Sequence, residues 1–341
     1  MKKLALIGGV AALALSATSA LAQEVTLRVH QLLPPQATIP AKAIEPWAEK
    51  VMEESDGRIK VELYPAMQLG GAPPELYDQA ADGFVDAIWT VIGYTPGRFP
   101  TSETFELPFM TTTAEASSQA FHEFMMENAA DEFSDTHVLA FHTHGPGMIH
   151  SKDPVETLED FQDMKIRGGS RVINLMLEEL GATPVGMPVP AVPEGLTSGV
   201  ISATTIPWEV TPSLRVAELV DNHTGFAGDR GWYTQTFVFT MNNDTYNGLP
   251  DDLKAVVDAN SGIELAKAFG RVMDDGDAVG LKIAEDAGNN IIMLGEEETA
   301  RWREVAQGIT EEWIADMDAR GLDGAALVEK ARAAIDKYSS M

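Results

Sequence analysis

The most constraining feature of this sequence is a regular alternation of strand-like and helix-like segments. Residues 25–30 and 58–64 show the two-residue alternation of apolar side chains that half-buried strands require, and residues 39–52 have helical spacing. Residues 73–83 follow as a helix with proline near its start, and residues 84–91 are apolar enough for a buried strand. This β-α-β-α-β order predicts an α/β fold in which helices cover both faces of a sheet.

A second cycle of the same kind begins near residue 138. Strands are expected at residues 138–141, 164–167, 183–187, 200–204, 233–241 and 291–294, and helices at 157–161, 171–180 and through most of the chain after residue 250. The sheets are therefore expected to be mixed but mostly parallel.

No long linker separates the two cycles, so the chain is expected to pass more than once across a hinge. We predict one lobe from residues 23–145 plus 236–275 and a second lobe from residues 146–235 plus 276–341. Two lobes joined in this way close around a ligand in the cleft between them. The expected architecture is the two-lobed fold of periplasmic binding proteins.

The first residues predict export. Lys2 and Lys3 form a basic start, residues 4–14 are apolar, and residues 20–22 have the small-x-small pattern that precedes a cleavage site. We therefore expect a signal peptide at residues 1–22, a mature protein that begins near Gln23, and a periplasmic location. No cysteine is present to carry a lipid anchor.

Composition excludes several classes of function. The chain has 52 acidic and 24 basic residues and a formal charge of −28, a field that repels nucleic acid and anionic membranes. An anionic ligand would need its own local positive charge. The absence of cysteine excludes disulfides, thiolate metal sites and cysteine nucleophiles. No cofactor is expected, and the protein is expected to be a monomer.

Arg167 is the strongest candidate for that local positive charge. It ends the apolar run of residues 164–167, and the Gly168-Gly169-Ser170 turn and a helix follow it. A guanidinium at the tip of a strand, beside glycines that let a ligand approach, is suited to hold a carboxylate through two parallel hydrogen bonds. The alternative is a structural salt bridge with one of the many acidic residues.

Several motifs in order give the chain a family resemblance. They are Tyr64 to Gly71 ("YPxxQLG"), Gly83 to Asp86 ("GxxD"), Glu106 to Phe109 ("ELPF"), Leu158 to Arg167 (similar to "LEDLKGLKIR") and Leu180 to Val185 ("LGAxPV"). The sequence resembles, over its whole length, the DctP-like solute-binding proteins of tripartite ATP-independent periplasmic (TRAP) transporters.

The resemblance implies a fold, a ligand and a partner. It implies two α/β lobes joined by crossing strands and a long helix, open when empty and closed around ligand. It implies that Arg167 holds a ligand carboxylate. The implied partners are a small organic anion and a membrane permease with small and large integral subunits.

Two departures from the family pattern bear on the ligand. Residues 142–150 lack the second ligand-contacting arginine of many members, and Ile206 stands where many have asparagine, with Trp208 after it. Sugar acids and dicarboxylates need many hydrogen bonds, because each buried polar group left unpaired costs about 1–3 kcal/mol. We therefore favour an aromatic or apolar monocarboxylate such as a benzoate-type acid. The alternatives are a C4-dicarboxylate, a 2-oxo acid or a sugar acid.

Other residues are candidates for the pocket, each with a structural alternative. The aromatic candidates could equally be core, and Arg171 could instead pair with Glu178 or Glu179. Arg98 is more typical of a residue that fixes its loop. The ligand-binding set predicted beside Arg167 is Gln31, Trp89, Tyr94, His144, His150, Arg171, Ile206, Trp208 and Trp232.

A second hypothesis from another class is an exported metal-dependent hydrolase. His142, His144 and His150 could supply imidazole ligands to zinc. Against it, the sequence has no HExxH helix, no G-x-S-x-G elbow and no Walker loop. No metal site is predicted, and His144 or His150 is expected to hydrogen-bond the ligand instead.

Overall fold

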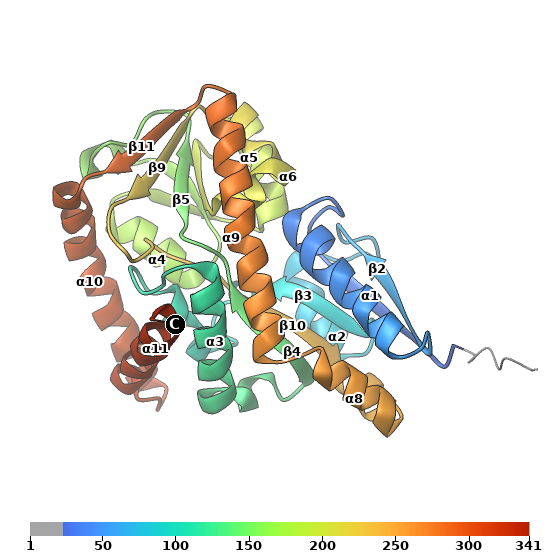
Figure 1. The fold of residues 1–341 in the computed structure, drawn as a ribbon. Coiled ribbons are helices and arrows are strands. Elements are labelled where there is room, and N and C mark those ends of the chain that lie inside the picture. The colour runs from blue at the N-terminus through green and yellow to red at the C-terminus, as the bar shows by residue number, and fades with distance from the viewer. Residues whose placement is uncertain (1–22, 341) are drawn as a thin grey trace, which may run out of the picture.

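The computed structural model describes residues 23–340, and the predicted signal peptide at residues 1–22 lies outside them. The described chain forms two mixed sheets with helices packed around them (Figure 1). The first sheet has the order β2-β1-β3-β10-β4 and the second has the order β11-β9-β5-β8-β6-β7. Five of the nine strand pairings between described residues are parallel, as the α/β prediction requires.

The strands and helices have the following bounds. The first sheet contains β1 (Val25–Gln31), β2 (Ile59–Tyr64), β3 (Ala87–Val91), β4 (Thr136–Thr143) and β10 (Thr236–Asn242), and the second contains β5 (Met148–Ser151), β6 (Lys165–Gly168), β7 (Thr183–Gly186), β8 (Ala203–Ile206), β9 (Asn222–Phe226) and β11 (Asn290–Leu294). The α-helices are α1 (Glu45–Glu54), α2 (Leu76–Ala81), α3 (Ala114–Asn128), α4 (Arg171–Glu179), α5 (Val192–Ser198), α6 (Thr211–Leu214), α7 (Asn243–Gly248), α8 (Asp251–Ala259), α9 (Ile263–Asp286), α10 (Glu296–Ala319) and α11 (Gly324–Ser339). A π-helix, η1 (Pro40–Ile44), precedes α1, and the 3₁₀ helices are η2 (Pro73–Glu75), η3 (Ile92–Tyr94), η4 (Pro100–Glu106), η5 (Ala130–Phe133), η6 (Leu158–Phe161), η7 (Val189–Ala191), η8 (Trp208–Val210) and η9 (Val216–Glu218).

The β6–α4 unit fixes the end of the strand that carries Arg167. Ser170 caps α4, because its Oγ accepts the backbone N–H of Ile173 at 3.3 Å. The helix then buries one face at helical spacing, made of Val172, Ile173, Met176 and Leu177. Capping and burial therefore hold α4 in position after β6. They also fix the turn between the strand and the helix.

The chain crosses between the sheets in two adjacent segments. Residues 144–147 lead from β4 to β5, and residues 227–235 lead from β9 to β10. The two crossings are hydrogen-bonded, because Gly147 N–H donates to Tyr233 O at 2.9 Å. A Cβ atom at Gly147 would lie 2.0 Å from Tyr233 Cε1, so only glycine fits there.

Helix α9 makes the third crossing and runs past both sheets (Figure 1). On the side of the first sheet, this helix contacts α3 and strand β4. On the side of the second sheet, it contacts η8 and α6. Gly280 lets this helix lie directly on the backbone of η8, because a Cβ atom there would be 2.0 Å from Trp208 O.

Two acidic side chains of α9 bind the starts of other helices. Asp274 accepts the backbone N–H groups of Ala114 and Glu115 at 2.7 and 2.9 Å, at the start of α3. Asp277 accepts the backbone N–H of Glu209 at 2.7 Å, at the start of η8. Carboxylates are stabilising at helix N-termini, so α9 is fixed to an element beside each sheet.

The hydrophobic core is divided between the sheets. The larger cluster surrounds the first sheet, continues into α9 and α11, and extends to α5 and β8 beside the second sheet. A separate cluster lies under β6, α4 and α10. Helix α11 returns from the second sheet to contact α3. Among residues 23–340, no helix combines the length and the apolar character needed to cross a membrane.

Candidate ligand-binding site

Arg167 lies at the end of β6, between β7 and β8, and its side chain is completely buried. Its Nε donates to Met187 O at 2.9 Å and its Nη1 donates to Thr205 O at 3.0 Å. Its Nη2 reaches Tyr94 Oη at a longer distance, 3.4 Å. The guanidinium is therefore held by the backbone carbonyls of Met187, which follows β7, and Thr205, which lies in β8. It points toward Tyr94, which follows β3 of the first sheet.

The charge of Arg167 is not neutralised by the protein. All of its acceptors are uncharged, and no ion pair among the described residues includes it. A guanidinium has five N–H donors. Three of the Arg167 N–H donors are engaged. Of the two that remain, one is on Nη1 and the other is on Nη2. A buried, unpaired charge is costly, and this pair of donors matches a carboxylate that binds through both oxygens.

Tyr94 ends η3 and connects the arginine to the rest of the site. Its hydroxyl oxygen accepts the backbone N–H of Val189 at 2.8 Å as well as the bond from Arg167. Burial raises the pKa of Tyr94, with Arg167 opposing, so the phenol stays neutral. Its own proton remains available to donate to an anion beside Arg167.

A small, mainly apolar cavity adjoins this tyrosine. Its volume is about 30 Å³. Its walls come from both sides of the molecule and include Leu32, Leu33, Trp89 and Phe237 from the first side and Val189 and Ile206 from the second. Trp89, Tyr94, His144 and Ile206 are the predicted site residues that the structure brings together on this lining.

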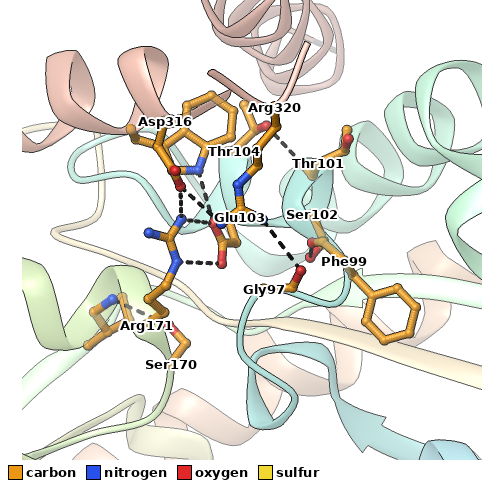
Figure 2. Close-up of polar contacts among 12 residues, drawn as sticks. Gly97, Phe99, Thr101, Ser102, Glu103, Thr104, Ser170, Arg171, Asp316 and Arg320 are labelled. Atoms are coloured by element: carbon orange, nitrogen blue, oxygen red, sulfur yellow. Dashed lines mark hydrogen bonds and ion pairs between the residues drawn. The ribbon is translucent and has the colours of Figure 1, made fainter. Parts of the chain in front are cut away.

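A larger open groove of about 460 Å³ lies on the other side of Tyr94. It contains Arg171, but that cation is already paired. Arg171 binds Glu103 through both carboxylate oxygens at 3.0 and 2.5 Å and lies 3.1 Å from Asp316 (Figure 2). The structure therefore places Arg171 in a structural ion-pair network. It pairs with neither of the glutamates considered from the sequence.

Trp89 forms a rigid aromatic wall of the cavity. It stacks on Phe237 with ring centroids 5.2 Å apart, and its indole N–H donates to His142 Nε2 at 2.7 Å. Burial lowers the pKa of His142 to about 3, so this imidazole is neutral and can accept that bond. The stacking and the hydrogen bond therefore fix the plane of the Trp89 indole ring without any contact from a ligand.

His144 lines the cavity, but both of its ring nitrogens are occupied by backbone groups. Nδ1 donates to Gly145 O at 2.5 Å, and Nε2 accepts the backbone N–H of Gln235 at 3.0 Å. Burial lowers the pKa of His144 to about 3. It can therefore offer a ring surface to a ligand, but neither a charge nor a free hydrogen-bonding nitrogen.

His150 and Trp208 lie in the second sheet's core rather than on the cavity lining. His150 bonds His223 at 2.7 Å between their Nδ1 atoms and bonds Ile206 O at 3.1 Å. Trp208 packs with Met148 in a small cluster beneath α9. The prediction assigned both to the pocket. The difference arises because His150 lies within β5 and bonds His223 of β9, and Trp208 begins η8 and packs beneath α9.

Gln31 and Trp232 also lie outside the lining. The Gln31 amide is occupied by both backbone groups of Leu33, donating to its carbonyl at 2.8 Å and accepting from its N–H. Trp232 packs edge-on against Phe161 and Trp302 in the second core. Arg98 pairs with Asp78 on the surface, as expected of a loop-fixing residue.

Sequence reasoning missed two polar residues of the cavity, Gln235 and Glu209. Each is at most 4 % exposed, and Gln235 Nε2 and Glu209 Oε1 have no hydrogen-bond partner in the described chain. The Gln235 amide lies over Gly169, where an added Cβ atom would be 2.3 Å from Nε2. Their positions in the sequence could have identified these two residues, because Glu209 follows the end of β8 and Gln235 precedes β10.

The imidazoles do not converge on a metal. His142 is bound to Trp89, His144 to the backbone and His150 to His223. Among residues 23–340, no three histidine or acidic side chains are placed to hold a metal ion.

Comparisons with known proteins show similarity to TRAP solute-binding proteins. A TRAP solute-binding protein from Rhodoferax ferrireducens T118, solved with copurified benzoate, is 47% identical with a TM-score of 0.91, covering 92% of this chain and 98% of that one. A marine metagenome TRAP solute-binding protein specific for aromatic acid ligands, in complex with metahydroxyphenylacetate, is 49% identical with a TM-score of 0.91, covering 92% and 99%. The C4-dicarboxylate-binding periplasmic protein DctP of Rhodobacter capsulatus is 25% identical over 90% of this chain and 92% of its own length.

These matches confirm the resemblance that the motifs predicted, and with it the two-lobed α/β fold. The likeness extends over nearly the whole chain. The family model for bacterial extracellular solute-binding protein, family 7 (DctP), matches residues 30–316, and the chain therefore belongs to this family of solute-binding proteins.

Proposed function

We propose that this protein binds an aromatic or apolar monocarboxylate and delivers it to a TRAP membrane permease. The observation that carries the proposal is Arg167, a buried guanidinium with an unbound donor on each terminal nitrogen and no carboxylate partner in the described chain. One carboxylate satisfies both donors and the charge. The structures solved with benzoate and metahydroxyphenylacetate, both at nearly half identity, support this ligand class.

The cavity lining disfavours the alternative ligands. Among the described lining residues, none is a lysine or arginine that could bind a second carboxylate, and Glu209 is acidic. Trp89 and Phe237 offer ring faces instead of the many hydrogen bonds that a sugar acid needs. Burial of an aromatic ring against such walls stabilises the complex by its apolar area.

Titration calorimetry with benzoate, succinate and glucuronate tests the ligand class. We expect benzoate to bind at least about 100-fold more tightly than either of the others, because each buried polar group left unpaired costs about 1–3 kcal/mol. Tighter binding of succinate or glucuronate than of benzoate would contradict the proposal.

The lobes, the location and the transport partner form the rest of the proposal. The two lobes close on the ligand about the three crossings. One lobe consists of residues 23–145 plus 236–275, and the other consists of residues 146–235 plus 276–341. The protein acts in the periplasm after removal of residues 1–22. Small-angle scattering should show a smaller radius of gyration on adding benzoate, and osmotic-shock fractionation should release a protein that begins near Gln23. An unchanged radius, or retention in the cytoplasm, would contradict these points.

A further inference from the structure

Glu209 is an acidic residue in the wall of a cavity that otherwise suits an apolar ligand. It is 3 % exposed, it lines the cavity, and its Oε1 is enclosed without a hydrogen-bond partner in the described chain. Burying a hydrogen-bonding group without a partner is destabilising, so such a group calls for an explanation. The ligand contacts proposed for Arg167 and Tyr94 make no use of it.

The protein fixes Glu209 from three sides. Its backbone N–H donates to Asp277 at 2.7 Å, and its backbone carbonyl accepts a bond from Thr38 Oγ1 at 3.3 Å. Gly276 makes room for the side chain, because a Cβ atom there would lie 2.7 Å from Glu209 Cγ. The backbone of Glu209 in η8 is therefore held by α9 and the segment after β1, and Gly276 leaves space for its side chain.

The surroundings keep this carboxyl group neutral near pH 7. Burial raises the pKa of Glu209 to about 8, and the nearby Asp277 carboxyl contributes, while Thr38 opposes the shift. Burial likewise raises the pKa of Asp277 to about 7. A neutral acid does not repel the carboxylate of a ligand, and it retains a carbonyl oxygen that accepts a hydrogen bond.

Glu209 contacts a different part of the protein from the lining residues that adjoin the arginine. Tyr94 bonds Arg167, and Gln235 lies over Gly169 in the turn that follows it, so these two lining residues mark the arginine end. Glu209 lies against α9 and Thr38 instead. When the lobes open to admit a ligand, one that binds Arg167 through its carboxylate and extends into this cavity can reach Glu209 with its opposite end.

We propose that Glu209 binds a hydroxyl group on the ring of an aromatic acid and makes the protein selective for hydroxylated aromatic acids. This inference rests on the proposed function. The hydroxyl group donates to Glu209 Oε1, which otherwise stays unpaired. An unsubstituted ring leaves that oxygen buried without a partner, so the site discriminates against it.

Calorimetry at pH 7 with benzoate, 3-hydroxybenzoate and 4-hydroxybenzoate tests the inference. The wild type should bind at least one hydroxylated acid about tenfold more tightly than benzoate, the ratio expected from one buried hydrogen bond. Glu209→Gln keeps a carbonyl acceptor and should keep the preference. Glu209→Leu should abolish the preference. Glu194→Leu, the same substitution at an exposed position outside the lining, is the matched control and should keep the preference.

The outcomes separate this inference from the proposed function. Equal binding of all three acids by the wild type, or a preference that survives in Glu209→Leu, would overturn the role of Glu209 while leaving aromatic acid binding in place. Failure of the wild type to bind any of the three would overturn both. The wild-type ratio decides the matter even if Glu209→Leu does not fold.

Discussion

Replacing Gly280 with alanine should destabilise the protein by about 2 kcal/mol, even though alanine is the better helix former. The added Cβ would lie 2.0 Å from Trp208 O, 2.7 Å from Trp208 C and 2.9 Å from Thr211 Oγ1. Two of these atoms are backbone, so α9 and η8 must move apart. Overpacking costs about 1–3 kcal/mol, and the rigid contact places this site at the upper end. The helix gains about 1 kcal/mol from the change.

Gly308 provides the matched control. It lies on the exposed face of α10, a helix of the same length, and an added Cβ would meet nothing within 4 Å. Gly308→Ala should therefore stabilise the protein by about 1 kcal/mol. Urea unfolding of both variants should show opposite signs and a difference of about 3 kcal/mol. If both variants shift stability in the same direction by similar amounts, the claim that α9 rests on the η8 backbone is wrong.

Three further predictions concern polar groups. Arg171→Met should lower the free energy of unfolding by about 2 kcal/mol, because Glu103 is left buried without its arginine partner. This value lies between those for surface and buried ion pairs. A shift of the melting temperature under about 1 °C would contradict the prediction. Raising the pH from 6 to 8 should cost the wild type about 2 kcal/mol more stability than Glu209→Gln. The reason is that folding raises the pKa of Glu209 from its ordinary 4.5 to about 8, so the folded state holds a proton that the unfolded chain has lost. Parallel pH profiles of the two proteins in urea unfolding would refute this prediction. Gln235→Leu should weaken binding of every aromatic acid by about tenfold, since its unpaired Nε2 lies over Gly169 in the turn after Arg167 and can donate to the ligand carboxylate. Unchanged dissociation constants would exclude that contact.

The order of the elements was largely predictable because the side-chain periods that define them are local. Strand β1 and the β6–α4 unit occur where the apolar spacing placed them. Strands β5 and β9 were not predicted. Each is short, β9 contains asparagine, histidine and glycine, and both are specified by their neighbours in the sheet. Helix α3 was also missed, although Phe121, Phe124 and Met125 have helical spacing and its start is capped by Thr113.

The candidate site was predictable in its charge but less so in its walls. Arg167 was proposed because a strand, a glycine turn and a following helix are all local signals, and because the family resemblance implies the same residue. Leu33 was missed because its direction depends on the Gln31 amide, which binds both of its backbone groups. Glu209 was missed because its burial depends on α9, which is distant in sequence.

The central claim is that Arg167 binds the ligand carboxylate, and benzoate titration of two arginine variants tests it most directly. Arg167→Met and Arg98→Met each remove one positive charge, but Arg98 is paired with Asp78 at the surface. We expect Arg167→Met to weaken benzoate binding by about 100-fold or more, because removing one partner of a buried charge pair costs about 2–5 kcal/mol. Arg98→Met should stay within about threefold of the wild type. Equal benzoate affinity in the two variants, with both folded, would contradict the account.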